Sequence, residues 1–229
     1  MKAVLNIVLG LCALALIYIC YASIMGPINF ENAQKTRETA VKARLIDIRK
    51  AQQEYRMLHN GKYTASMDTL IDFVKNQKLP FVMKLGQLTD QQLEDGLTEQ
   101  KAVRIIEKAK KTGRFDEVKK WGLENFKRDT TWVAVLDTVY PRGFNPDSMR
   151  YIPFSEGMMF EMAARNDTDA NTGAPLNLFE VKAPYESFLR GLDNQEIINL
   201  RELAEKTNRY PGLKVGDIET PNNGAGNWE

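Results

Sequence analysis

The chain has 229 residues, of which 43% are hydrophobic and 27% charged, and its 31 Lys and Arg against 30 Asp and Glu leave a net charge of +1. Such a balance excludes the broad basic field with which nucleic-acid-binding domains hold phosphates, so we expect no nucleic acid partner. Both cysteines, Cys12 and Cys20, lie near the N-terminus, which excludes disulfides, thiolate catalysis and cysteine metal sites from the rest of the chain.

An apolar run over residues 3–25 comes first, and its only clearly polar members are Asn6 and Ser23. As a helix it would extend about 35 Å, enough to cross a hydrocarbon core of about 30 Å. Lipid offers the backbone no hydrogen-bond partners, which makes a helix the only workable conformation for a single span. The sequence therefore predicts a transmembrane anchor over residues 1–26, with the lipid bilayer as its first partner.

A removable signal peptide is the alternative, because Lys2 supplies a charged start and residues 20–22 a small-x-small cleavage site. The apolar run is longer than the usual secretory core of about 7–15 residues, which favours a retained span. Basic residues follow the span closely: Lys35, Arg37, Lys42 and Arg44. The positive-inside rule would place the body in the cytoplasm, yet long domains translocate largely regardless of charge. We expect a single-pass protein of the cytoplasmic (inner) membrane with an extracytoplasmic body.

Residues 27–60 predict a helical stalk. Gly26-Pro27 ends the span, and the proline predicts a kink or break there. Asn60-Gly61 supplies a left-handed cap at the other end. Apolar residues recur at spacings of three and four along one face of the stalk: Val41, Leu45, Ile48, Ala51, Tyr55 and Leu58. This stripe is the candidate stalk interface; it either packs against the chain's own body or bundles with other copies or another subunit.

Residues 61–229 predict an α+β body outside the membrane. Ser66 caps a helix over residues 67–76, and a strand region follows at 78–88. Residues 89–128 predict a charged helical insertion, because Thr89 with Gln92 forms a capping box. Within the insertion Thr98 caps a second helix that ends at Gly113, and a third follows around Trp121.

Strand patterns dominate after the insertion. Branched and aromatic residues predict a strand over 130–140, and a hairpin turn at 155–157 joins residues 150–154 to 158–164. Further strands are predicted at 178–181 and 213–218, with a helix between them that Asp193 caps. The glycine-rich segment 221–226 is too polar to pack well, although Trp228 beyond it could dock.

The N-terminal third resembles a known family. The apolar helix, its amphipathic extension with residues 48–55 (IRKAQQEY) and the cap at 60–63 (NGKY) are similar to type IV pilins and to the pseudopilins of type II secretion. The resemblance implies a protein that acts by assembly. In that family a leader ending in glycine is followed, five positions on, by glutamate; here Gly10 is followed by Ala15. We therefore expect a pilin-like relative that stays in the membrane.

Two segments are candidates for ligand or proton chemistry. Asp167, Asp169 and Asn171 are spaced like the start of a calcium loop, but Leu178 stands where a bidentate glutamate is needed, and an ordinary turn is the simpler interpretation. His59, the sole histidine, ends the stalk, where an imidazolium suits a helix C-terminus. No cofactor or metal is predicted.

The sequence favours a membrane-anchored, non-enzymatic structural or assembly protein that self-associates through span and stalk or presents its body to partner proteins. An accessory single-span subunit of a larger membrane complex is the first alternative, consistent with the small residues Gly10, Ala13 and Ala15 in the span. A membrane-anchored enzyme that uses paired carboxylates is the second.

Overall fold

The computed structural model describes residues 2–168 and 173–229, which form an α+β fold with a long N-terminal apolar helix. The chain divides into two compact units. The first comprises Met1–Lys75 and Pro141–Glu229, and the second Asn76–Tyr140. The predicted α+β class is confirmed. The second unit extends from residue 76 to residue 140, and so is longer than the 89–128 insertion that the helical patterns predicted.

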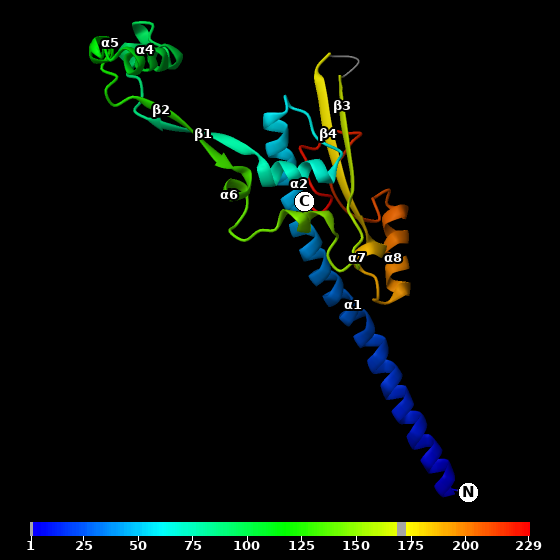
Figure 1. Cartoon of the computed structure of the whole chain (residues 1–229). Coiled ribbons are helices and arrows are strands. Elements are labelled where there is room, and N and C mark those ends of the chain that lie inside the picture. The colour runs from blue at the N-terminus through cyan, green and yellow to red at the C-terminus, as the bar shows by residue number, and fades with distance from the viewer. Residues whose placement is uncertain (1, 169–172) are drawn as a thin grey trace. The chain divides into compact units, whose positions relative to one another are not determined.

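One uninterrupted helix, α1 (Lys2–Leu58, 57 residues), organises the first unit. Of the kink or break expected at Pro27, the break is wrong, because the helix continues through this residue. Proline removes only one backbone donor, and the turns on either side keep their own hydrogen bonds. Figure 1 shows the blue N-terminal half of α1 projecting away from the other elements of its unit. The cap at the far end is as predicted: Asn60 and Gly61 have φ of 53° and 82°, and the Gly61 N–H donates to the Arg56 carbonyl at 3.0 Å.

A three-stranded antiparallel sheet in the order β3-β4-β5 completes the core of this unit. Its strands are β3 (Glu161–Thr168), β4 (Pro175–Pro184) and β5 (Gly212–Gly216). The central strand β4 is the most buried, with Phe179 and Val181 in the core. The connecting helices are α2 (Met67–Asn76), the 3-10 helix η1 (Pro146–Arg150), α7 (Tyr185–Phe188) and α8 (Asn194–Lys206). α1 packs against β5, α7 and η1.

The C-terminal tail packs closely against the sheet, so the expectation of a loose tail is wrong. Gly226 bridges to Val215 of β5, and the Asn227 side chain donates to the Gly212 carbonyl at 2.9 Å. At the chain end, the Glu229 carboxylate lies 2.7 Å from the Arg49 guanidinium of α1. The Lys42 ammonium lies 6.0 Å from the Trp228 ring, which has docked on α1. Gly224 is buried, and a Cβ there would lie 3.2 Å from the Phe179 ring of β4, so the missing side chain lets this polar segment approach the sheet, which composition alone does not indicate.

The second unit is a two-stranded antiparallel ribbon with a helical cluster between its strands. β1 (Lys78–Leu85) pairs with β2 (Lys127–Ala134), so that Lys78 lies opposite Ala134 and Leu85 opposite Lys127. The cluster contains α3 (Asp90–Glu94), α4 (Glu99–Thr112) and α5 (Asp116–Lys120), with the capping box at Thr89 and the caps at Thr98 and Gly113 as predicted. It has its own core: Leu97, Ala102, Ala109, Val118, Leu123 and Phe126.

Two strand predictions need correction. The strand expected over 130–140 ends at Ala134, and α6 (Val135–Val139) takes its second half. The Val135 N–H donates to the Gln77 carbonyl at 3.0 Å, and the Thr138 hydroxyl to the Ala134 carbonyl, which turns the chain out of the ribbon. The hairpin expected around 155–157 has only an isolated bridge between Tyr151 and Met159, and regular pairing begins at Glu161.

Candidate functional site

The N-terminal half of α1 is the most unusual surface in the first unit. Residues 6–29 are exposed throughout, and the most apolar stretch has a mean hydropathy of 2.4 with none of it covered. Among the described residues this is one helix that is long and apolar enough to cross a membrane. Exposed apolar patches of this size on a monomer mark contact with lipid or protein. The covered part of α1 begins at Phe30, which is 8% exposed.

The six residues of the predicted stalk interface separate into two groups. Val41, Leu45, Ile48 and Ala51 are completely buried within the first unit. Of the two interpretations that the stripe allowed, packing on the chain's own body therefore holds for these four, and a partner cannot reach them. Tyr55 is half-buried and stacks on the His59 ring with a centroid distance of 3.7 Å, and Leu58 is 37% exposed.

Gln52 is a buried polar residue in α1 that the spacing of the apolar residues does not indicate. Its Nε2 donates to the Thr64 carbonyl at 2.7 Å, and its Oε1 accepts from the Thr64 N–H at 3.2 Å. This pair of bonds fixes the connection between α1 and α2. Gln52 lies on the same face of α1 as Ile48. The sequence signal for its role was a glutamine on an otherwise apolar stripe.

Three charged residues of α1 are partly buried by the body. Burial lowers the pKa of Arg44, against the opposing attraction of Asp47, and burial raises the pKa of Asp47 and of Glu54. The Arg44 Nη1 and Glu54 Oε2 atoms are buried without a hydrogen-bond partner among the described residues. Burying these two polar atoms without partners lowers the stability of the fold, and it results from the close packing of the body around α1 beyond Phe30.

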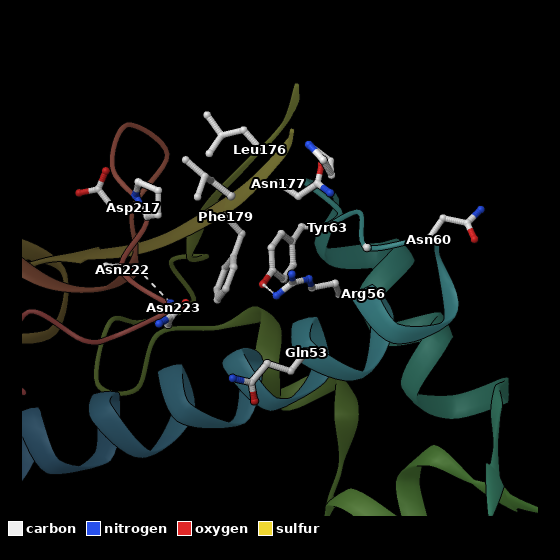
Figure 2. Close-up of a pocket in the computed structure, with 15 residues that line it drawn as sticks. Gln53, Arg56, Asn60, Tyr63, Leu176, Asn177, Phe179, Asp217, Asn222 and Asn223 are labelled. Carbon is white, nitrogen blue, oxygen red and sulfur yellow. Dashed lines mark hydrogen bonds between the residues drawn. The ribbon is translucent and has the colours of Figure 1, made fainter. Parts of the chain in front are cut away.

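A surface groove of about 460 Å³ lies where the C-terminal end of α1, the start of β4 and the C-terminal tail meet. Figure 2 shows the rings of Tyr63 and Phe179 facing each other, with Arg56 beside Tyr63 and the Asn60 side chain directed away. The two ring centroids are 4.7 Å apart, and Arg56 Nη1 donates to the Tyr63 hydroxyl at 3.2 Å. Side-chain amides such as Asn177 and Asn222 line much of the remainder.

Among the described residues that line the groove, Asp217 is the carboxylate, and it already has its partners. Burial opposes its ionisation, but a hydrogen bond from Lys214 at 2.9 Å and N–H donors from Thr220 and Glu219 outweigh this and lower the pKa of Asp217 to about 2. Lys214 also donates to the buried Glu180 at 3.0 Å, and these acceptors raise the pKa of Lys214 against the effect of burial. The Lys214 network joins β4 to β5 and has a structural role.

The other two candidates from the sequence, His59 and the possible calcium loop, do not line the groove. His59 Nδ1 lies 2.8 Å from the Tyr55 carbonyl oxygen at the helix end, in keeping with a capping position. No group of three or more His, Cys, Asp or Glu side chains suitable for a metal occurs within residues 2–168 and 173–229. Of the candidate calcium loop, Asp167 pairs with Arg165 at 2.8 Å, and residues 169–172 lie outside the described residues.

Comparison of the chain with protein-family models, with curated proteins and with solved structures found no match.

Proposed function

We propose that this is a membrane-anchored, non-enzymatic structural or assembly protein, with the apolar half of α1 in the bilayer and the first unit held directly at the membrane face. The observation that carries the proposal is the division of α1 at Phe30. Before it the helix is apolar and uncovered, and after it the same helix forms the core of the body. Because the helix is continuous, the half in the bilayer would fix the position of the half that lies in the body.

Association between copies would use the bare half of α1. The body covers the stripe at Val41, Leu45, Ile48 and Ala51, whereas the apolar surface of the span is uncovered and open to a second copy. The division into a bare apolar half and an enclosed amphipathic half supports the proposed likeness to pilins and pseudopilins. Ala15 in place of the family's glutamate supports a role that stays within the inner membrane. The extracytoplasmic side is the proposed location of the body.

The proposal of a non-enzymatic role rests on the state of the titratable groups near the groove. Asp217 is committed to Lys214 and to two backbone donors, and Arg56 is stacked on and bonded to Tyr63. A general acid or base needs access to substrate and a pKa near the working pH, whereas Asp217 is held far below it.

The native cysteines provide a direct test of span association. Cys12 and Cys20 are both exposed on the bare half of α1, and the body contains no cysteine, so any intermolecular disulfide must form in the span. Eight residues at 100° each place the two thiols about 80° apart around the helix. Oxidative cross-linking in membranes should give a dimer through one cysteine more efficiently than through the other.

Three variants define this experiment. Cys12→Ser and Cys20→Ser identify the face that pairs, and the double variant should give no cross-link. The dimer fraction should persist when the protein is diluted with lipid, which distinguishes association from random collision. Absence of any cross-link in membranes at the natural protein level would contradict self-association.

A second candidate function, an accessory subunit of a larger membrane complex, is favoured by a groove in the second unit. This groove has a volume of about 380 Å³ and is lined by Ile106, Phe115, Val118, Leu123 and Phe126, with Lys110, Lys119 and Lys127 among its polar neighbours. An apolar groove beside several lysines suits an acidic amphipathic segment of another protein. Native purification that recovers foreign subunits, without the span cross-link, would favour this candidate.

A further inference from the structure

The loop of residues 151–159, here called the tip loop, joins η1 to β3 in the first unit. Both of its flanks are tied to the α2 region. η1 is linked to α2 by Lys75 and Asp147, whose charged atoms are 2.7 Å apart. β3 returns to the same region, where Asn166 exchanges two hydrogen bonds with the Tyr63 backbone at 2.9 and 2.8 Å. The chain therefore runs along α1 toward its N-terminal end, turns in the tip loop and returns.

The turning point lies against α1 just above its bare half. The Arg37 guanidinium carbon is 5.3 Å from the centroid of the Phe154 ring. Arg37 follows Phe30, the first covered residue, by seven positions, or about 10 Å along the helix. Side chains on a helix lean toward its N-terminus, which brings the guanidinium and the ring closer still to the uncharged segment that ends at Glu31. The headgroup layer occupies about 5–7 Å on each side of the hydrocarbon core.

Phe154 is an unusual residue for an exposed turn. The residue is 52% exposed and its backbone has φ of 63°, a left-handed conformation that is uncommon for a bulky residue. The buried Ser155 holds it there: its hydroxyl donates to the Ile152 carbonyl at 2.6 Å and accepts from the Met158 N–H at 3.0 Å. The loop thus keeps an aromatic ring outward at a conformational cost, as functional contacts often do.

The charges around the ring fit a lipid surface. Arg37 is anchored beside it by hydrogen bonds to the carbonyls of Phe188 and Arg190, at 3.0 and 2.8 Å. Arg190 is exposed and pairs loosely with Glu156 at 3.6 Å. Phenylalanine rings combined with arginine or lysine side chains are typical of segments that lie at the boundary between headgroups and acyl chains.

We propose that the tip loop is a second membrane contact, in which Phe154 enters the headgroup boundary of the bilayer that holds α1, with Arg37 and Arg190 beside the lipid phosphates. The proposal rests on the proposed anchoring of α1. Two points of contact would fix the rotation of the first unit about the helix axis and decide which of its faces is presented to partners.

Single-cysteine variants of the full chain in phosphatidylcholine vesicles test this contact. In a Cys12→Ser, Cys20→Ser background, Phe154→Cys and Met57→Cys are each labelled with an NBD fluorophore. Met57 is the matched control, since it is an apolar residue 68% exposed at the opposite end of α1. A third variant that retains Cys20 alone reports on the span itself.

The expected result is blue-shifted emission at position 154 that is quenched by a lipid carrying a nitroxide near the headgroup, with unquenched, water-like emission at position 57. Emission at 154 that matches position 57 while Cys20 is quenched overturns the tip-loop contact and leaves the anchor intact. Blue-shifted emission at 154 without nitroxide quenching identifies a copy-to-copy contact and also overturns it. Absence of quenching at all three positions contradicts the anchor and the loop contact together.

Phe154→Asn separates lipid contact from folding. Asparagine tolerates the left-handed backbone, so this variant should unfold at the same urea concentration as the native chain or higher. In a parallel set with the fluorophore on a cysteine at exposed Met158, the asparagine variant should lose most nitroxide quenching. Retention of full quenching in the folded variant would show that Phe154 makes no lipid contact.

Discussion

Replacing Leu45 with alanine tests whether the body is clamped onto α1. Leu45 is completely buried, so the variant loses about three buried carbon groups at about 0.8 kcal/mol each. A cavity term of about 24 cal/mol per Å³ raises the cost, and buried Leu→Ala changes typically fall at about 2.7–5 kcal/mol. We expect a loss of about 3–4 kcal/mol in the free energy of unfolding of the first unit.

Leu9→Ala is the matched control, because Leu9 lies on the same helix but is 69% exposed. Urea unfolding in detergent micelles, followed by the fluorescence of Trp228, measures both variants. Trp121 and Trp132 are replaced by phenylalanine, so the remaining tryptophan reports from the tail docked on α1. A Leu45→Ala cost below about 0.5 kcal/mol, equal to that of Leu9→Ala, would refute the packing of α1 in the body.

Three further predictions use the same reporter. The pKa of Asp217 is lowered from 3.8 to about 2, so its contribution to the free energy of unfolding is complete above pH 4 and is lost as the pH falls toward 2. Asp217→Asn should therefore flatten the acid side of the plot of stability against pH. An unchanged acid side would contradict the pairing of Asp217 with Lys214. Gly216→Ala should lower the free energy of unfolding by more than about 1 kcal/mol, because a Cβ at φ of 76° would collide with the Phe179 carbonyl oxygen. In the control Gly191→Ala, at φ of 80°, the Cβ meets open space, so only the backbone penalty of about 1 kcal/mol is expected. Equal costs would refute the close approach of β5 to β4. Gln52→Leu leaves the Thr64 N–H and carbonyl without hydrogen-bond partners and should lower the free energy of unfolding by about 2–4 kcal/mol. The control Gln53→Leu, at an exposed position, should cost almost nothing. Similar values for both variants would show that the buried hydrogen bonds are not formed.

The features that could be predicted from sequence are those that local chemistry decides. The Thr89–Gln92 capping box, the caps at Thr98 and Asp193 and the left-handed end at Asn60-Gly61 each depend on residues within one turn. The α+β class followed from the same signals, since helical periodicity and strand-rich segments occupy separate parts of the chain.

The features that sequence could not supply depend on contacts between distant residues. Strand composition indicated β1 and β2 but could not show that they pair with each other and leave the β3-β4-β5 sheet to the other unit. The docking of the tail rests on Arg49 meeting Glu229, residues 180 positions apart. Periodicity found the buried stripe of α1, whereas whether the body or a second copy covers it was a question of tertiary packing.

The reactivity of the two native cysteines in intact vesicles tests the central claim most directly. Cys12 and Cys20 lie on the exposed surface of α1's bare half, where only a surrounding medium can protect them. If that medium is lipid, a membrane-impermeant maleimide should leave both unlabelled until detergent and denaturant are added, while a cysteine at position 57 in vesicles opened to both sides labels at once. Rapid labelling of Cys12 and Cys20 in intact vesicles, or full-length protein that remains in the aqueous fraction, would contradict an anchor in the bilayer.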